Sequence, residues 1–245
     1  KPCRGDPMTT MLITGANRGL GLDFVRRLAP EGWHIHACCR NPAKAADLQA
    51  LAQKHDVTVH ALDVADFDQI DALKKTLGDT PIDVLFNNAG IMETIQRTLS
   101  LDHTNQMFDT LDEDEWMAVM RVNTMAPMRM CEVFVDNVAA SDRKQMLMMG
   151  SIVGSIGSNA TGRWYHYAAS KTALNMVMRS LAADLKDRGI TVMSLHPGWT
   201  QTDMGGPEAA LTIDESVGGM VEVMKGLTPP DSGRFIGWNG EDVPW

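Results

Sequence analysis

The sequence predicts an α/β fold, a doubly wound parallel sheet of seven strands in a single domain. The first observation is that seven short apolar runs alternate with segments of helical length, which is typical of strands joined by right-handed crossovers. The second is that each run is apolar at both odd and even positions, as in strands buried on both faces of a parallel sheet. The third is that the chain contains no internal repeat, low-complexity tract or linker at which it would divide.

The runs predict strands, in chain order, at residues 11–15, 33–39, 57–62, 82–90, 145–151, 190–198 and 233–238. The longest irregular stretch, Ile91 to Asp112, follows the fourth strand, and we expect it to form part of the rim of a cleft. The domain is expected to span residues 8–245. Residues 1–7 are polar and rich in proline, and we interpret them as an expression remnant or a disordered N-terminal extension.

The composition argues against several classes of partner. A net charge of −9, from 22 Lys and Arg against 31 Asp and Glu, is unsuited to nucleic acid or to an anionic membrane surface. No apolar run reaches the ~18 residues of a membrane span, and the first residues lack the apolar region of a signal peptide. The four cysteines show no disulfide framework, since Cys38 and Cys39 are adjacent. The sequence therefore predicts a cytoplasmic protein that acts on a small molecule.

The turn after the first predicted strand has the chemistry of a dinucleotide site. Gly15, Gly19 and Gly21 lie where this strand ends and the first helix begins. Glycines permit a tight turn and a close backbone approach, while the helix N-terminus presents free N–H groups and a positive dipole end to a pyrophosphate. Three glycines also fit an ordinary strand-to-helix turn, so the rest of the chain must decide between the two interpretations.

Four further segments favour the dinucleotide site. "NNAG" ends the fourth predicted strand at residues 87–90, "RVNT" contains Asn123, Tyr167 and Lys171 are four positions apart, and "HPGWTQT" occupies residues 196–202. Together with the Gly-x-x-x-Gly-x-Gly turn, these segments resemble, in order, the motifs of the short-chain dehydrogenase/reductase family, from about residue 11 to 237. The resemblance implies a Rossmann fold. Within the family, the chain looks most like the group that contains the bacterial C-signal proteins and the insect carbonyl reductase sniffer.

Tyr167 and Lys171 form the pair from which acid–base chemistry is expected. A hydride added to a carbonyl carbon leaves negative charge on the oxygen, which requires a proton donor and a hydrogen-bond donor. A free phenol has a pKa of about 10, so action near neutrality requires about three units of stabilisation of the phenolate, roughly 4 kcal/mol. Lys171 would lie one helical turn from Tyr167, where a cation lowers the pKa of its neighbour by about 1 to 3 units.

The resemblance also implies roles for two further side chains. Ser151, followed by two residues and then Gly154 in the family's spacing, would polarise the carbonyl, with Ser155 as the alternative. Asn123 would bind a water that links Lys171 to bulk solvent; the alternative is a helix asparagine satisfied by the backbone.

Two arginines favour NADP(H) over NAD(H). NAD-specific folds place an acidic residue after the second strand, whereas this chain has Arg40 there and Arg18 just before Gly19. Each charge-assisted contact to a 2′-phosphate is worth roughly 1.5 to 3 kcal/mol; the alternative is that both arginines are solvated. The resemblance implies that Asp63 and Val64 contact the adenine. The predicted cofactor-binding residues are Gly15, Asn17, Arg18, Gly19, Leu20, Gly21, Arg40, Asp63, Val64, Asn88, Ala89, Gly90, Tyr167, Lys171, Pro197, Gly198, Trp199, Thr200 and Thr202.

No metal site is predicted. His34, His36 and Cys38 alternate along the second predicted strand and share a face, but no fourth ligand is visible. "GSIVG" is also not a Gly-x-Ser-x-Gly nucleophile elbow, which argues against a serine hydrolase.

The sequence thus predicts an NADP(H)-dependent oxidoreductase that transfers a hydride between the nicotinamide and a carbonyl or alcohol substrate, with reduction of a ketone or aldehyde as the favoured direction. The alternative from another class is a cofactor-binding signalling or regulatory protein of the C-signal type with little or no turnover. An epimerase or dehydratase is disfavoured, because 245 residues leave no sizeable C-terminal substrate domain. The family's usual Val-Asp-Gly-Gly ending is absent, which leaves both a homodimer and a homotetramer open.

Overall fold

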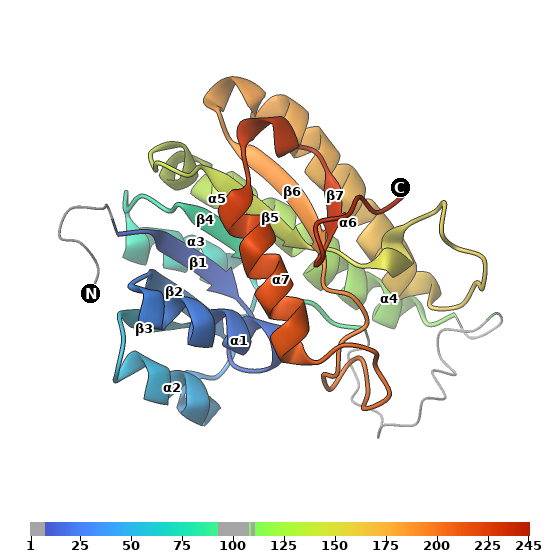
Figure 1. Cartoon of the computed structure of the whole chain (residues 1–245), viewed down its shortest axis with the longest axis horizontal. Coiled ribbons are helices and arrows are strands. Elements are labelled where there is room, and N and C mark those ends of the chain that lie inside the picture. Colours follow the sequence, from blue (N-terminus) through green and yellow to red (C-terminus); the bar gives the residue numbers. More distant parts are fainter. Residues whose placement is uncertain (1–7, 93–107, 109–110) are drawn as a thin grey trace.

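The computed structural model describes residues 8–92, 108 and 111–245, and its centre is a parallel sheet covered by helices on both faces (Figure 1). The predictions for residues 1–7 lie outside the described residues, as do those for most of the stretch from Ile91 to Asp112. None of the described helices is long and apolar enough to cross a membrane.

The prediction of a doubly wound parallel sheet of seven strands is confirmed. The strands are β1 (Thr10–Thr14), β2 (His34–Cys39), β3 (Val57–Ala61), β4 (Val84–Asn87), β5 (Gln145–Met149), β6 (Thr191–His196) and β7 (Phe235–Gly237). Their order across the sheet is β3-β2-β1-β4-β5-β6-β7, and every neighbouring pair is parallel.

The direction of winding reverses between β1 and β4. The chain builds β2 and β3 on one side of β1 and then returns to place β4 on its other side, in the register Met11 to Val84 and Ile13 to Phe86. In open α/β sheets, the crevice at the carboxyl ends of the strands at such a reversal is where ligands bind. The Gly-rich turn follows β1 and the "NNAG" segment ends β4, so both border this crevice.

Seven helices longer than one turn are described, together with shorter helical turns. The helices are α1 (Gly19–Leu28), α2 (Ala46–Ala52), α3 (Phe67–Leu77), α4 (Glu113–Met120), α5 (Ala126–Ala139), α6 (Tyr165–Asp184) and α7 (Ile213–Gly226). Apolar residues of α1, α2 and α7 pack on one face of the sheet, and those of α3, α5 and α6 pack on the other. A π-helical turn, Arg121–Met125, joins α4 to α5, and a 3₁₀ turn, Ile152–Gly154, follows β5.

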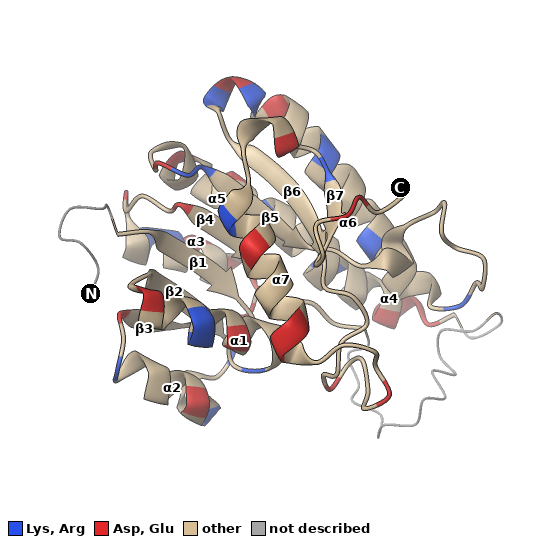
Figure 2. Cartoon of the chain, viewed as in Figure 1, with Lys and Arg blue, Asp and Glu red and all other residues tan. Residues whose placement is uncertain are grey.

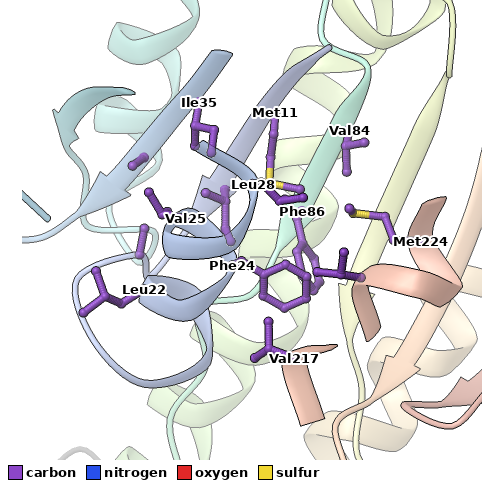
Figure 3. Close-up of a cluster of buried hydrophobic side chains, with 14 of the residues drawn as sticks. Met11, Leu22, Phe24, Val25, Leu28, Ile35, Val84, Phe86, Val217 and Met224 are labelled. Carbon is purple, nitrogen blue, oxygen red and sulfur yellow. The ribbon is translucent and has the colours of Figure 1, made fainter. Parts of the chain in front are cut away.

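Apolar packing holds both helical layers to the sheet. On the α1 and α7 face, the rings of Phe24 and Phe86 meet edge to face with centroids 4.9 Å apart, and Val217 and Met224 of α7 lie in the same cluster (Figure 3). Full burial of an apolar side chain of this size contributes roughly 1.5–3 kcal/mol. Charged residues are interspersed over helices and loops, and none lies in a strand of the sheet (Figure 2).

Candidate active site

The turn between β1 and α1 is tight because two of its glycines adopt a backbone conformation that favours glycine. Gly15 and Gly19 have φ values of +68° and +53°. A Cβ at Gly21 would stand 2.3 Å from the carbonyl oxygen of Gly15, so only glycine permits this approach of helix and turn. Asn17 is exposed and Leu20 is half-buried in the same turn.

The N-terminus of α1 is suited to an anionic ligand. Arg18, at the N-cap position, makes no side-chain cap hydrogen bond, and the first turn of the helix contains no acidic residue. A Cβ at Gly19 would meet only the Thr202 methyl group within 4 Å, at 3.9 Å, so the backbone here faces open space. Free N–H groups, a positive dipole end and a glycine at the point of approach are what a pyrophosphate requires. The residues present therefore fit a dinucleotide cofactor.

The "NNAG" segment joins β4 to the end of β1. The Thr14 hydroxyl accepts hydrogen bonds from the backbone N–H groups of Asn88 (3.1 Å) and Ala89 (3.0 Å). The Asn88 side chain donates to the carbonyl oxygens of Thr14 (2.8 Å) and Gly15 (3.2 Å). Asn88 thereby fixes the position of the Gly-rich turn. The sequence analysis did not select Thr14, because a threonine ending a buried strand carries no signal by itself.

Asn123 lies in the π-helical turn between α4 and α5, and it is fully buried. Its side chain accepts from the N–H of Ile91 (2.9 Å) and donates to the Ile91 carbonyl (2.8 Å) and the Ser170 hydroxyl (3.0 Å). Single π-helical turns inside helices are frequent at functional sites. The side chain is thus satisfied inside the protein and connects the chain after β4 to α6. The role of Asn123 in binding a relay water stays a prediction.

Ser151, Tyr167 and Lys171 come together at the carboxyl end of β5. Ser151 caps the 3₁₀ turn after β5, and its hydroxyl lies beside the phenol of Tyr167, which lies in the first turn of α6. The Lys171 ammonium lies 5.7 Å from the centre of the Tyr167 ring and donates to the carbonyl oxygen of Met149 (2.8 Å). A Cβ at Gly90 would stand 3.4 Å from the Lys171 Nζ, so the end of β4 also borders the group.

Burial dominates the electrostatics of this pair. It raises the pKa of Tyr167 to about 12, an effect that the neighbouring Ser151 hydroxyl opposes. It also lowers the pKa of Lys171 to about 8. The sequence analysis expected Lys171 to lower the pKa of the phenol. In the protein alone the pKa of the phenol is instead raised, because burial disfavours the charged phenolate.

The two alternative serines have different surroundings. The Ser155 hydroxyl donates to the carbonyl oxygen of Trp245 (3.3 Å), shares a hydrogen bond with the Ser158 hydroxyl (2.9 Å) and accepts from the Ser158 N–H (3.1 Å). These contacts hold the loop after β5 together. Ser151 contacts Tyr167, and the geometry therefore favours Ser151 over Ser155 as the group beside the phenol.

Gly154 allows the 3₁₀ turn to lie directly on α6. A Cβ at Gly154 would stand 2.8 Å from the backbone carbon of Lys171. The Gly154 carbonyl accepts from the Thr172 hydroxyl (3.0 Å) and the Asn175 side chain (3.4 Å), and Asn175 in turn accepts from Ser194 of β6 (2.9 Å). The sequence analysis noted Gly154 as part of a pattern and gave no role to Thr172 or Asn175, because only the packing of turn on helix reveals their contacts.

The loop after β6 also borders the site, because its Thr202 methyl group lies near Gly19. Gly198 has φ +76°, and a Cβ there would stand 2.3 Å from the side chain of Leu211. The Thr200 hydroxyl donates to the Pro197 carbonyl (3.0 Å), and the Thr202 hydroxyl accepts from the N–H of Gly205 (3.1 Å). A further residue of this loop is Trp199, which is 56% exposed and donates through Nε1 to the Gly205 carbonyl (2.8 Å).

The residues predicted for the adenosine end lie along the ends of β2 and β3. Arg40 is exposed directly after β2, and it makes no ion pair within the described part of the chain. Arg18 forms an ion pair with Asp203 of the loop after β6. Asp63 accepts from the N–H of Ala65 (3.0 Å), and neighbouring Val64 lines a small hollow between the end of β1 and the π-helical turn.

The histidines of β2 form a hydrogen-bonded row with a third histidine on β3. His34 and His36 are joined through their Nε2 atoms (3.1 Å), and His36 Nδ1 lies 3.0 Å from Nε2 of His60. Among the residues that the structure describes, no group of three or more His, Cys, Asp or Glu side chains is arranged to hold a metal ion.

Comparisons with known proteins agree with this geometry. A family model described as short chain dehydrogenase matches residues 9–210. The C-signal of Myxococcus xanthus is 36% identical over 165 residues, which cover 67% of this chain and 93% of the C-signal. Two solved structures, the carbonyl reductase Sniffer of D. melanogaster and the NADPH-bound carbonyl reductase from chicken fatty liver, each superpose with a TM-score of 0.86 at 32% identity, over 98% of this chain and 100% of theirs. The family match includes both the Gly-rich turn and the segment from Ser151 to Lys171.

Proposed function

Because the chain belongs to the short-chain dehydrogenase family, we propose that it is an NADP(H)-dependent oxidoreductase that reduces the carbonyl group of a ketone or aldehyde to an alcohol. The observation that carries the proposal is the contact of Ser151 with Tyr167 next to Lys171, on the same edge of the sheet as the open N-terminus of α1. Binding alone would not require a buried phenol, a hydroxyl and an ammonium in one group.

Each side chain then has a role in the reaction. When bound, the reduced nicotinamide supplies the hydride. Tyr167 donates a proton to the carbonyl oxygen, and Ser151 hydrogen-bonds the same oxygen, where the negative charge develops. Lys171 is held beside the ring by the Met149 carbonyl and stabilises the phenolate that remains after proton transfer. Asn123 belongs to the path by which Lys171 regains contact with solvent protons.

The preference for NADP(H) over NAD(H) rests on charge. Arg40 lies at the end of β2, where an acidic residue would favour the ribose hydroxyl of NAD, and its guanidinium is exposed without an ion-pair partner in the described part of the chain. Arg18 is near but shares its charge with Asp203. We therefore assign the larger contribution to Arg40. The chicken carbonyl reductase with a similar structure binds NADPH, which supports the same choice.

The substrate is proposed to be an apolar carbonyl compound. Ile152 directly follows Ser151, and its side chain is exposed, as are those of Ile156 in the loop after β5 and of Trp199 and Met204 in the loop after β6. Exposed apolar side chains on the two loops that border Ser151 would give an apolar ketone or aldehyde surface to bury.

The test is the absorbance of NADPH at 340 nm, and separately that of NADH, with a panel of ketones, aldehydes and quinones. Wild-type protein is expected to oxidise NADPH faster than NADH, and Tyr167→Phe is expected to bind NADPH with unchanged affinity and to lose turnover. Tight NADPH binding without turnover of any carbonyl would instead favour a regulatory protein of the C-signal type, for which the similarity to the Myxococcus xanthus protein is the supporting observation.

A further inference from the structure

His196 joins the two segments that follow the neighbouring strands β5 and β6 at the candidate site. It is the last residue of β6 and is half-buried. Its Nδ1 accepts a hydrogen bond from the backbone N–H of Ile152 (3.2 Å) and another from that of Gly198 (3.3 Å). Ile152 follows Ser151, and Gly198 belongs to the loop after β6.

The position of His196 explains why a side chain makes this connection. The backbone bonds between the two chain segments end with the N–H of Gly150, which donates to the Leu195 carbonyl (2.7 Å). Beyond this point β5 turns into the 3₁₀ turn of Ile152–Gly154, while β6 continues into the Pro197 loop. Beyond this last backbone hydrogen bond, the imidazole of His196 connects the two segments.

The hydrogen bonds define the chemical form of the ring. A nitrogen that accepts from two N–H groups carries no proton, so the neutral ring must carry its proton on Nε2. Burial lowers the pKa of His196 to about 4, which keeps the ring neutral near pH 7 and leaves Nδ1 able to accept. A protonated ring would present an N–H to two N–H groups and would break both contacts.

We propose that His196 is a positioning residue, which holds the Ser151 turn at a set distance from the Gly198 loop through the two hydrogen bonds to Nδ1. This inference rests on the proposed function, in which Ser151 contacts the substrate carbonyl and the Gly198 loop is one of the segments predicted to bind the cofactor. His196 itself contacts neither reacting group. It acts on the chemical step by keeping the hydroxyl of Ser151 aligned with the point at which hydride arrives, and a small misplacement of such a group lowers the rate strongly.

Two substitutions at His196 distinguish the effect of the hydrogen-bond acceptor from the effect of losing the imidazole ring. In His196→Asn, the side-chain oxygen stands close to the position of Nδ1 and can accept both N–H groups. In His196→Leu, a side chain of similar reach offers no acceptor. We expect His196→Leu to lower kcat by about tenfold or more, with the affinity for NADPH changed by less than about threefold, and His196→Asn to retain kcat within about threefold of wild type. Equal losses in the two variants, or none in His196→Leu, would overturn the proposal.

A second readout does not depend on turnover. Hydrogen exchange at the amides of Ile152 and Gly198 is expected to be slow in the wild type and in His196→Asn, and faster by about tenfold in His196→Leu. Nitrogen NMR of the wild-type ring is expected to show an unprotonated Nδ1 and a protonated Nε2. Fast exchange of both wild-type amides, or a proton on Nδ1, contradicts the connection, and both measurements remain decisive if His196→Leu does not fold. If the wild type reduces no carbonyl while the amides are protected, the proposed function fails and the connection stands.

Discussion

At the scale of single residues, two side chains of the same type that lie close in the sequence can have quite different contacts. Ser151 and Ser155 are both buried and four positions apart, yet one contacts the Tyr167 phenol and the other joins the loop after β5 to the Trp245 carbonyl. The pair therefore offers an internal comparison, in which the same change at two nearby sites removes either a group beside the phenol or a structural hydrogen bond.

We expect Ser151→Ala to lower kcat by about 10²-fold, since a removed oxyanion donor costs roughly this much. Ser155→Ala should retain kcat within about threefold and lower the free energy of unfolding by about 1 kcal/mol, through the lost hydrogen bonds. Steady-state kinetics and urea unfolding of both variants check the prediction. A larger loss of kcat in Ser155→Ala than in Ser151→Ala would reverse the assignment.

Arg40 is expected to decide between the two cofactors. Arg40→Ala should raise the KM for NADPH by about tenfold or more and leave the KM for NADH nearly unchanged, because only NADPH carries the 2′-phosphate. Arg26, exposed on α1 and paired with Asp47, is the matched control, and Arg26→Ala should change neither constant. Equal effects of Arg40→Ala on both cofactors would exclude a specific phosphate contact.

Motif spacing predicted the residues that meet at the site, but not their contacts. Tyr167, Lys171 and Ser151 lie together, and Asn88 binds the Gly-rich turn. The pairing of Arg18 with Asp203 could not be foreseen, since the two residues are 185 positions apart and no periodicity relates them. The raised pKa of the phenol in the protein alone could not be predicted either, because burial is a property of the packed structure.

At the scale of elements, the 3₁₀ turn of Ile152–Gly154 and α6 are packed and hydrogen-bonded together as one part of the site. The turn is bonded to α6 through Thr172 and Asn175, and α6 contains both Tyr167 and Lys171. Gly154 is the point of closest approach, so its lack of a side chain controls the distance between Ser151 and the helix.

We expect Gly154→Ala to lower the free energy of unfolding by about 1–3 kcal/mol and to reduce kcat, because the new methyl group would overlap the Lys171 backbone. Gly226→Ala provides the control: it ends α7 without a positive φ, and a Cβ there would meet nothing within 4 Å. The control should be neutral or stabilising by up to about 1 kcal/mol. Thermal unfolding and turnover of both variants test this prediction. Equal stabilities of the two variants would contradict the expected overlap of the methyl group with the Lys171 backbone.

The strands were predictable from the sequence because they are buried on both faces, whereas the ends of elements and the turns were less predictable. All seven strands appear, but the fourth is shorter than the apolar run of residues 82–90, because Asn88 and Ala89 leave the ladder to donate to Thr14. The π-helical turn at Asn123 was not predicted, since its hydrogen-bond pattern depends on tertiary contacts with Ile91 and Ser170.

At the scale of the whole molecule, several histidines are buried in the neutral form. Burial lowers the pKa values of His36 and His196 to about 4, and the neighbouring charges of His34 and His60 add to the effect at His36. A histidine in the unfolded chain has a pKa of about 6.5. Between these pH values the unfolded chain binds more protons than the folded one, so acid favours unfolding there.

The free energy of unfolding should therefore be independent of these two groups above pH 6.5 and fall as the pH decreases to about 4, by about 3 kcal/mol for each. Urea unfolding at a series of pH values measures this slope. His196→Asn should make the slope shallower in that window, and an unchanged slope would show that His196 titrates alike in both states.

The strand order has a consequence for biosynthesis. β1 is the first strand of this sheet to be made, and one of its edges pairs only with β4, residues 84–87. The Thr14 hydroxyl likewise accepts from an N–H that lies 74 positions later. Until that part of the chain leaves the ribosome, β1 presents an unpaired apolar edge, which is a hazard for association between nascent chains. The site needs still more of the chain, since Ile152 finds its acceptor in His196, 44 positions further on. Such long-range pairing predicts slow folding. The site can bind a ligand only at the end of folding, when these distant segments have paired.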